Sequence, residues 1–254
     1  CAGPVKYIGA GTQKVEEELA ELFPGTEILR MDADTAAGRH EKLLHTFVQK
    51  KIPILLGTQM VAKGLDFENV TLVGVLAADM SLYMDHYLAG ERTFDLLTQV
   101  VGRAGRGEKK GRAVIQTYTP DNEVIACAAR QDYRTFLRGE LRLRRDRHCP
   151  PFADMFTLTV SGRQEGEVIR ASAQLRDGLR QALRYPSAAN MAVELLGPAP
   201  APVVRVNDRF RYRLFWVGRN DHTTREILGY YLKAFQEQRE NRALSLTIDC
   251  NTME

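Results

Sequence analysis

The segment Gln99-Val100-Val101-Gly102-Arg103-Ala104-Gly105-Arg106 carries residue types suited to holding a phosphate group. On helical spacing Gln99, Arg103 and Arg106 lie at i, i+4 and i+7, so one amide and two guanidinium groups would share a face. Each guanidinium offers paired N–H donors and a permanent positive charge. The pattern predicts a phosphate-binding helix end. A basic, frayed helix end favoured by the helix dipole is the alternative.

Gly11 and Thr12 lie between an expected strand and an expected helix, a second place where a phosphate could bind. Backbone N–H groups and the dipole at a helix N-terminus favour negative charge. Gly9-x-Gly11, with Asp32 about twenty residues on, also imitates a dinucleotide-binding fingerprint. Position 14 is Lys, however, where that fingerprint needs Gly or Ala for close helix packing. A nicotinamide-dependent Rossmann enzyme is therefore the less favoured alternative.

The first half of the chain alternates short apolar runs with helical patterns, and these elements would hold the candidate residues. Strands are expected at 5–8, 27–31, 52–56, 70–76 and 112–116, and helices at 12–23, 40–49, 90–103 and 122–138. Such alternation is typical of crossover connections and of a parallel sheet covered on both faces. Residues 1–138 are therefore predicted to form a doubly wound α/β layer.

A smaller domain is expected after a charged linker at 139–151, which ends in Cys149-Pro150-Pro151. Two consecutive prolines block regular structure. Within 152–254, strands are expected at 155–161, 192–196, 203–206, 211–217 and 244–249, and helices at 165–183 and 223–239. The order resembles a split βαβ sandwich with one sheet and two helices on one face. The predicted fold is thus an α/β parallel-sheet layer followed by a smaller α+β sandwich domain.

Two basic stretches stand out in a sequence whose overall charge, 35 Lys and Arg against 32 Asp and Glu, is nearly balanced. Residues 130–148 hold seven arginines against three acids, and residues 203–219 hold five against one, with aromatic side chains between them. Phosphate neutralisation combined with aromatic stacking is how proteins bind single strands. Arg211 and Arg213 are therefore predicted to contact DNA. A solvated strand face is the alternative.

Composition and spacing exclude several other classes of protein. With 44% hydrophobic and 26% charged residues, the 254-residue chain is expected to be globular. No run approaches 18 apolar residues and no signal pattern is present, so we expect no membrane partner and a cytoplasmic location. The four cysteines are scattered singly, and the histidines have neither metal nor triad spacing. The chain opens at Cys1, and we expect that it was cut from a longer protein.

Gln-x-x-Gly-Arg-x-Gly-Arg at 99–106 resembles motif VI of superfamily 2 helicases. The resemblance implies a RecA-like helicase lobe in which Gln99, Arg103 and Arg106 are catalytic. In that family the arginines reach the γ-phosphate of an ATP bound on a partner lobe. Residues 8–14 would then be motif IV, with Gly11 and Thr12 holding a phosphate of the DNA strand.

The segment Ile-Leu-Leu-Gly-Thr-Gln-Met-Val-Ala-Lys-Gly-Leu-Asp-Phe at 54–67 resembles motif V of the same superfamily, a loop that touches the DNA backbone and the nucleotide. The resemblance implies DNA contacts for Thr58, Gln59 and Lys63. It implies that Gly64 lets the backbone turn at the nucleotide and that Asp66 accepts a hydrogen bond from a ribose hydroxyl. A plain helix N-cap and a turn would explain the same residues without a function. The position about forty residues before motif VI favours the helicase interpretation.

Further matches narrow the resemblance to the replication-restart family of these helicases, the PriA family. They are Arg-Met-Asp-Ala-Asp-Thr at 30–35, Tyr-Leu-Ala-Gly-Glu-Arg-Thr at 87–93, Cys-Pro-Pro-Phe at 149–152 and Leu-Gly-Pro-Ala-Pro-Ala-Pro at 196–202. The family usually has Tyr where Cys149 stands. The resemblance covers nearly the whole chain. It implies the C-terminal part of an ATP-dependent 3′-to-5′ DNA helicase that recognises stalled or branched replication forks and initiates primosome assembly for replication restart.

The resemblance also indicates what this chain lacks. The sequence has neither Gly-x-x-x-x-Gly-Lys-[Ser/Thr] nor Asp-Glu-x-His, so ATP with Mg²⁺ would be bound mainly by a first lobe outside it. The chain alone is therefore expected to be inactive as an ATPase. The family carries a zinc-binding cysteine insertion before motif IV, and Cys1 stands where its last ligand would be. Zn²⁺ is expected in the parent protein but not in this fragment, because one thiolate does not make a zinc site.

Three kinds of partner follow from the resemblance. They are forked or single-stranded DNA, the acidic C-terminal tail of single-stranded DNA-binding protein, and other primosome proteins. Arg225, early in the last long helix, is the candidate anchor for a carboxylate of that tail. A non-enzymatic module that merely holds DNA or a protein tail is the competing class of function.

Overall fold

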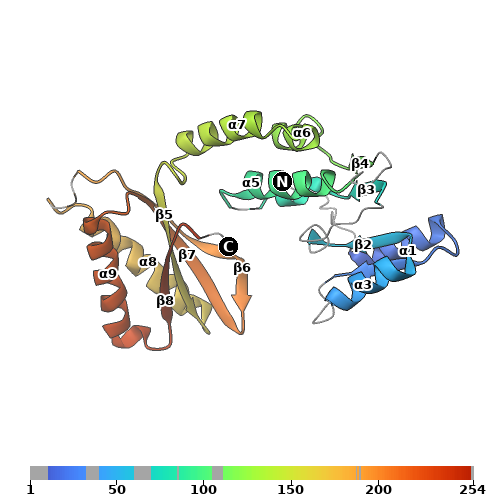
Figure 1. Cartoon of the computed structure of the whole chain (residues 1–254). Coiled ribbons are helices and arrows are strands. Elements are labelled where there is room, and N and C mark those ends of the chain that lie inside the picture. The colour runs from blue at the N-terminus through green and yellow to red at the C-terminus, as the bar shows by residue number, and fades with distance from the viewer. Residues whose placement is uncertain are drawn as a thin grey trace, which may run out of the picture. The chain divides into compact units, whose positions relative to one another are not determined.

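The computed structural model describes residues 11–32, 40–59, 70–84, 86–104, 111–186, 188 and 190–252. The chain divides into two compact units, residues 1–137 and 138–254 (Figure 1). Within the described residues, no helix is both long and apolar enough to cross a membrane. The expected strand at 5–8 lies outside the described residues.

Parallel strand pairs form the sheets of the first unit. β1 pairs with β2 and β3 pairs with β4, and all four strands contain four residues: β1 (Ile28–Met31), β2 (Ile54–Gly57), β3 (Leu72–Val75) and β4 (Arg112–Ile115). Met31 lies opposite Gly57, and Val75 lies opposite Ile115. The carboxyl ends of both strands in each pair therefore lie at one edge, where α/β proteins bind ligands.

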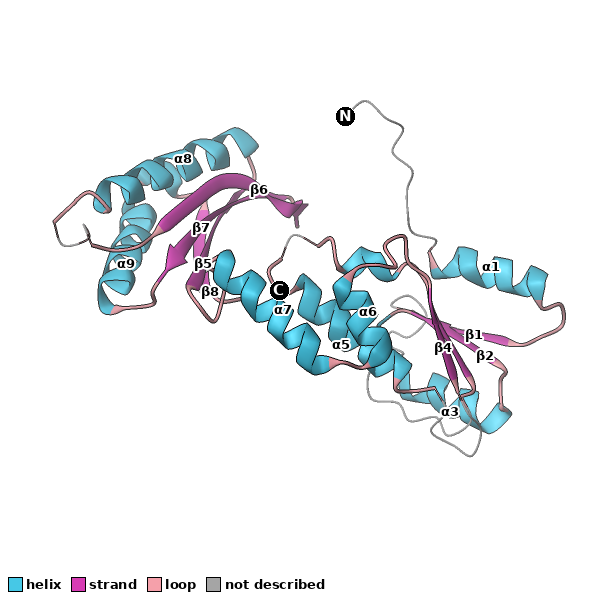
Figure 2. Ribbon diagram, turned by 90° about the horizontal axis from the view of Figure 1, so that it is seen from above, coloured by secondary structure: helices cyan, strands magenta, loops and turns pink. Residues whose placement is uncertain are grey.

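The helices of the first unit follow the expected strand-helix alternation. They are α1 (Thr12–Leu22), α3 (His40–Lys50), the 3-10 turn η1 (Ala78–Ser81), α5 (Ala89–Val101) and α6 (Glu123–Arg130), with α7 (Tyr133–Asp146) running across the boundary between the units. Figure 2 shows α5 and α6 lying side by side. This arrangement, with the antiparallel domain that follows it, confirms the predicted α/β class.

α5 is amphipathic, and its apolar stripe builds the core of this part of the unit. Ala89, Thr93, Phe94 and Leu97 lie at i, i+4, i+5 and i+8, on one side of the helix, and are buried. The Phe94 ring stacks on the Phe136 ring of α7, with centroids 4.1 Å apart and planes 6° apart. Both rings are buried, so the stack fixes how α5 lies against α7.

The prediction of one helix over 122–138 is wrong, because the chain forms two helices there. Gln131 adopts a left-handed conformation, with φ 56°, that ends α6. The Asp132 carboxylate then accepts a hydrogen bond from the Thr135 N–H at 3.1 Å, as an N-cap does. Asp132 therefore starts a new helix directly after the break.

The predicted linker at 139–151 is helical over 139–146, where α7 continues. Glu140 and Arg144 are buried and form an i,i+4 ion pair within the helix, with Nε and Oε1 2.8 Å apart. An Arg144 Nη1 also donates to the Pro150 carbonyl at 3.4 Å. Charged residues therefore extend the helix here, and regular structure is interrupted only near the two prolines.

The second unit is a four-stranded antiparallel sheet with two long helices. Its elements are β5 (Asp154–Gly162), α8 (Glu165–Ala182), β6 (Glu194–Val206), β7 (Arg209–Gly218), α9 (His222–Glu237), the 3-10 turn η2 (Arg239–Asn241) and β8 (Ser245–Cys250). The strand order is β6-β7-β5-β8. This is the split βαβ arrangement, with both helices on one face of the sheet (Figures 1 and 2).

The strands expected at 192–196 and 203–206 are one strand, β6. Irregular pairing between Leu196 and Ala199 and between Pro200 and Arg205 lets β6 continue past its prolines. Gly197 has φ +91°, and a Cβ there would lie 2.7 Å from the Arg213 carbonyl oxygen. Only glycine fits at this bend.

The core of the second unit lies between the sheet and the helices. Leu158 and Val160 of β5 and Leu214 and Trp216 of β7 are fully buried and pack against α8 and α9. Side chains alternate along a strand, so the odd-numbered residues of β5 and β7 face the opposite side of the sheet. The two faces of this sheet therefore have different roles.

A buried carboxylate ties together the loops that follow β3 and β4. Asp79 accepts hydrogen bonds from the Thr117 and Thr119 hydroxyls, at 2.7 and 2.6 Å, and from the Tyr118 N–H at 2.9 Å. Burial alone would raise the pKa of Asp79, but these hydrogen bonds together outweigh it and lower the pKa from 3.8 to about 2. The carboxylate is thus ionised at neutral pH and holds both loops at one edge of the sheet.

We expect Asp79→Ala to lower the free energy of unfolding at pH 7 by about 2 kcal/mol, because three donors lose their acceptor. The folded pKa lies below the unfolded value, so the stabilisation is present above about pH 4 and is lost as the pH falls toward 2. Urea denaturation across this range measures both effects. Asp121→Asn, an exposed carboxylate nearby, is the control. Equal stability of Asp79→Ala and the wild type would contradict the assignment.

Candidate functional site

The predicted DNA-contacting residues Thr12, Thr58 and Gln59 lie at the carboxyl edge of the β1–β2 sheet. Thr58 and Gln59 follow β2 directly and are exposed. Asp32 follows β1, and its Oδ2 accepts a hydrogen bond from the Thr12 hydroxyl at 2.6 Å. Because Met31 and Gly57 lie opposite each other, the first turn of α1 and the start of the loop after β2 lie at the same edge.

Asp32 and Arg30 are site residues whose pairing the sequence did not reveal. Arg30 Nε lies 3.1 Å from Asp32 Oδ2, and Arg30 Nη1 lies 2.8 Å from Glu16 Oε2. The side chains of Arg30 and Asp32 are largely buried. Arg30 thus offsets the negative charge that Asp32 brings beside the first turn of α1. The only signal in the sequence was the separation of about twenty residues, which imitated a dinucleotide fingerprint.

The predicted roles of Gly11 and Thr12 concern backbone and hydroxyl donors at the start of α1. Gly11 is exposed at the N-cap, and no side chain caps the helix. The Thr12 hydroxyl gives its proton to Asp32, so its oxygen remains only as an acceptor. An anion at this end of α1 would therefore depend on backbone N–H groups rather than on Thr12.

Gln99 and Arg103 lie at the carboxyl end of α5, close to where they were expected. The α-helix ends at Val101, two residues before the predicted end. The Arg103 N–H donates to the Val100 carbonyl at 3.1 Å, a tighter turn than an α-helix makes. Gln99 is exposed and Arg103 is half-buried. The α-helical spacing used for the prediction therefore does not continue through Arg103.

Gly102 separates α5 from this turn, and a neighbouring loop comes close to it. Its φ of −67° is ordinary for any residue, so conformation alone does not require glycine. A Cβ there would lie 3.2 Å from the Thr98 carbonyl oxygen and 3.5 Å from the Gln131 Nε2. The turn between α6 and α7 thus packs against the end of α5.

Several predicted site residues lie outside the described residues. They are Cys1, Lys63, Gly64, Asp66 and Arg106. In the part of the chain that the structure describes, no group of three or more His, Cys, Asp and Glu could hold a metal ion. The roles predicted for these five residues stay predictions.

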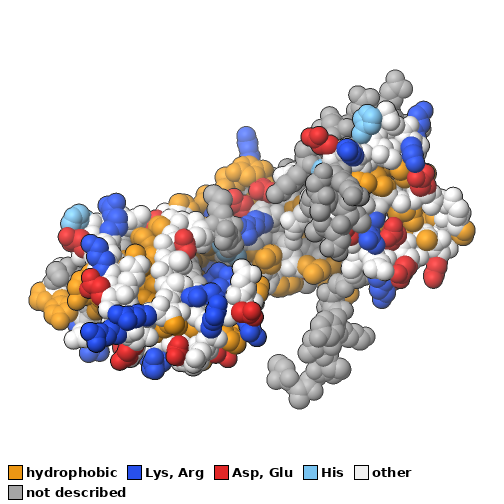
Figure 3. All heavy atoms as spheres, turned by 90° about the horizontal axis from the view of Figure 1, so that it is seen from below, with side chains coloured by type: hydrophobic (Ala, Val, Ile, Leu, Met, Phe, Trp, Pro, Cys, Tyr) orange, Lys and Arg blue, Asp and Glu red, His pale blue; other side chains and the backbone are white. Residues whose placement is uncertain are grey.

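Arg211 and Arg213 lie on β7 with their side chains on the sheet face that the helices leave uncovered. Two nitrogens of Arg211, Nε and Nη2, donate to the Val203 carbonyl at 3.2 and 2.8 Å. Both arginines are half-buried. Positive side chains are not confined to this strand, since Figure 3 shows Lys and Arg on both units, interspersed with acids.

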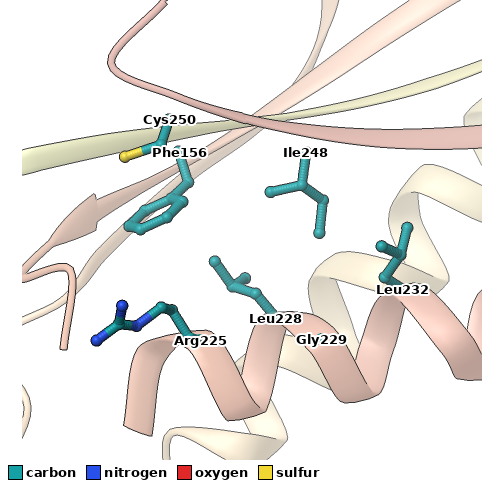
Figure 4. A pocket seen from close by; sticks show the side chains of 7 residues that line it. All are labelled: Phe156, Arg225, Leu228, Gly229, Leu232, Ile248 and Cys250. Carbon is teal, nitrogen blue, oxygen red and sulfur yellow. The ribbon is translucent and has the colours of Figure 1, made fainter. Parts of the chain in front are cut away.

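Arg225 lies at one end of an apolar groove between α9 and the sheet (Figure 4). The groove has a volume of about 210 Å³ and is otherwise lined by Phe156, Leu228, Gly229, Leu232, Ile248 and Cys250. Arg225 is exposed, and its Nε donates to the Asp221 carbonyl at 3.2 Å. Burial, and then the charge of Asp154, raises the pKa of the Cys250 thiol. The guanidinium is therefore the only charged group lining this groove in the described part of the chain.

Comparison with known proteins assigns the two parts of the chain to two families. Residues 6–108 match the helicase conserved C-terminal domain, and residues 145–252 match the primosomal protein N C-terminal domain. The chain therefore combines an α/β unit of the helicase C-terminal type with a second unit of the primosomal protein N C-terminal type.

The chain is similar to three curated proteins, each named replication restart protein PriA. The Bacillus subtilis protein is 41% identical over 99% of this chain and 31% of its own length. The Synechocystis protein is 43% identical over 84% of this chain and 25% of its own length, and the Rickettsia conorii protein is 34% identical over 88% and 34%. The chain belongs to the PriA family of replication restart proteins. It spans about a third of the length of these relatives or less.

Proposed function

We propose that this chain is the C-terminal part of an ATP-dependent 3′-to-5′ DNA helicase that recognises stalled or branched replication forks and initiates primosome assembly. The observation that carries the proposal is that residues of motif VI type lie at the end of a helix, α5, whose opposite face is firmly packed. Family membership over both units supports it. It also favours a helicase over a nicotinamide-dependent enzyme or a binding module without ATP dependence.

In this proposal Gln99, Arg103 and Arg106 act on an ATP that another lobe holds with Mg²⁺. Guanidinium groups from a second lobe stabilise the charge that develops on the transferred phosphoryl group. Gly64 and Asp66 would contact the same nucleotide. The burial of Phe94 and Leu97 supports the role of α5, because a helix held along one face positions its end reproducibly. The 254 residues alone would not hydrolyse ATP.

The carboxyl edge of the β1–β2 sheet would contact the backbone of the DNA strand. The backbone at Gly11 and Thr12 and the exposed residues Thr58 and Gln59 offer donors at this edge. Lys63 would add a positive charge. Closing of the two lobes on ATP would then couple hydrolysis to movement along the strand.

A zinc site involving Cys1 is proposed for the parent protein only. A structural zinc site takes four ligands, commonly cysteine thiolates. The described residues supply no such group, so any site that included Cys1 would depend on ligands outside them.

We expect Arg103→Ala, made in the longer chain that includes the first helicase lobe, to lower DNA-stimulated ATP turnover by about 10³-fold, as loss of an arginine finger does. DNA affinity should change little, because the side chain acts on the nucleotide. Steady-state ATP hydrolysis and fluorescence anisotropy on forked DNA measure the two quantities. Arg134→Ala, an exposed arginine of α7, is the control. Turnover equal to the wild type would contradict the role of Arg103.

The acidic tail of single-stranded DNA-binding protein is the proposed partner of the groove at Arg225. A groove lined by apolar side chains with one guanidinium at its end suits an apolar terminal residue and its carboxylate. Gly229 leaves room in the groove, since nothing lies within 4 Å of where its Cβ would be. The remaining acids of such a tail would face solvent and the positive charge of Arg225.

We expect Arg225→Ala to weaken binding of a short acidic peptide that ends in an apolar residue about tenfold, because a charged hydrogen bond is lost. Gly229→Leu should weaken binding as well by filling the groove. Lys233→Ala, an exposed residue of the same helix outside the groove, should bind like the wild type. Isothermal titration with the free-acid and amidated peptides measures this. Equal affinity in all variants would rule out the groove as the tail site.

A further inference from the structure

The face of the second sheet opposite the helices carries a row of arginines. Arg209, Arg211 and Arg213 are alternate residues of β7, so their side chains share a face. The even-numbered neighbours Leu214 and Trp216 pack into the core on the other face. The row therefore lies on the open side of the sheet, with successive residues about 6.6 Å apart along the strand.

The three guanidinium groups bond to neutral groups or to none. Arg209 Nη2 donates to the Ser161 carbonyl at 2.8 Å and to the Ser245 hydroxyl at 3.2 Å. Arg211 donates to the Val203 carbonyl. Arg213 Nε is buried without a hydrogen-bond partner. Among the described residues no carboxylate pairs with any of the three, so their positive charge is not neutralised within this part of the chain.

Hydroxyl groups lie beside the arginines on the neighbouring strands. Thr159 of β5 lies opposite Arg213, and Ser161 lies opposite Arg211. Thr247 and Ser245 of β8 continue the same two rows. The face thus combines fixed positive charge with hydroxyl groups that can donate to phosphates and can donate to or accept from base edges.

Aromatic and acidic residues lie further along the same face. Phe215 follows Arg213 in the alternation and is half-buried. The acids whose positions place them on this face are Asp249 of β8, in register with Thr157, and Glu194 of β6, opposite Val217. Both lie beyond Phe215 or level with it, away from the arginines. The positive row therefore ends at Phe215, and negative charge begins level with that residue, at Asp249.

We propose that this open sheet face binds single-stranded DNA, with Arg209, Arg211 and Arg213 on successive phosphates and Phe215 under a base. The inference rests on the proposed function, which already requires DNA contacts, and assigns them to one face. A sheet face lets unpaired bases lie flat on it and stack on aromatic rings, and Phe215 is partly exposed on this face. A duplex keeps its bases inside, so it would meet only the arginines.

The test is fluorescence anisotropy of the 254-residue chain with labelled oligo(dT) over a range of salt concentrations. Arg213→Gln should weaken binding several-fold and reduce the slope of log affinity against log salt by about 0.7, as expected for one lost phosphate contact on a single strand. Arg213→Lys should keep most of the slope, because it keeps the charge. The single strand should bind more tightly than a duplex of equal length.

Matched variants on α8 show whether a change in DNA affinity depends on the sheet face or only on the net charge of the protein. Arg170→Gln removes the same charge from an exposed position on α8 and should bind like the wild type. Thr159→Glu places a carboxylate among the arginines, opposite Arg213, and should weaken binding more than Arg213→Gln does. Gln174→Glu, an exposed position on α8, should change it little. Circular dichroism melting shows whether each variant is folded.

The outcomes distinguish this inference from the proposed function. Equal losses for Arg213→Gln and Arg170→Gln would overturn the sheet face as the binding surface, as would unchanged affinity in folded Thr159→Glu. Tighter binding of the duplex would overturn the choice of a single strand. If the wild-type chain bound no DNA at low salt, the inference would fail outright. The helicase function would still be judged by ATP turnover of the longer chain.

Discussion

The helix that carries Gln99 and Arg103 can position them only because its opposite face is buried. Phe94 and Leu97 of α5 fill the core beside α6, and Phe94 stacks on Phe136. An exposed helix end would otherwise fray, and a guanidinium on a long side chain would sample many positions. Packing on one side and chemistry on the other is therefore the constraint on which this unit depends. The close contact between Gly102 and the turn at Gln131 extends that packing to the last residue before Arg103.

The sheets also have a buried side that packs in the core and an edge or face that presents polar groups. At the β1–β2 edge, the Thr12–Asp32 hydrogen bond joins α1 to the strand that precedes Asp32, beside Thr58. At the β3–β4 edge, Asp79 holds two loops with three hydrogen bonds. In the second unit, α8 and α9 cover one sheet face, and the other face keeps a row of arginines. In each case the polar groups lie outside the apolar core, and the core holds the elements that carry them.

Periodicity and motif spacing predicted most of the elements, because apolar residues at helical or alternating positions report burial directly. Local backbone events were not predictable in this way. The break at Gln131 depends on one left-handed residue followed by a capping Asp132. The extension of α7 through the expected linker depends on the buried Glu140–Arg144 pair. The roles of Arg30 and Asp79 stayed hidden for a related reason, since each depends on partners distant in sequence. Motif residues such as Gln99 were recognisable because their types and spacing carry the chemistry themselves.

The most direct test of the account is ATP hydrolysis on forked DNA by the 254-residue chain beside the longer chain that includes the first helicase lobe. The proposal is that this chain supplies residues that act on a nucleotide held elsewhere. It predicts DNA-stimulated turnover in the longer chain and none in the 254 residues alone. Turnover by the 254 residues alone would show that they hold ATP themselves. Absence of DNA-stimulated turnover in the longer chain would show that the two lobes together do not form an ATP-driven motor. Either result would contradict the central claim.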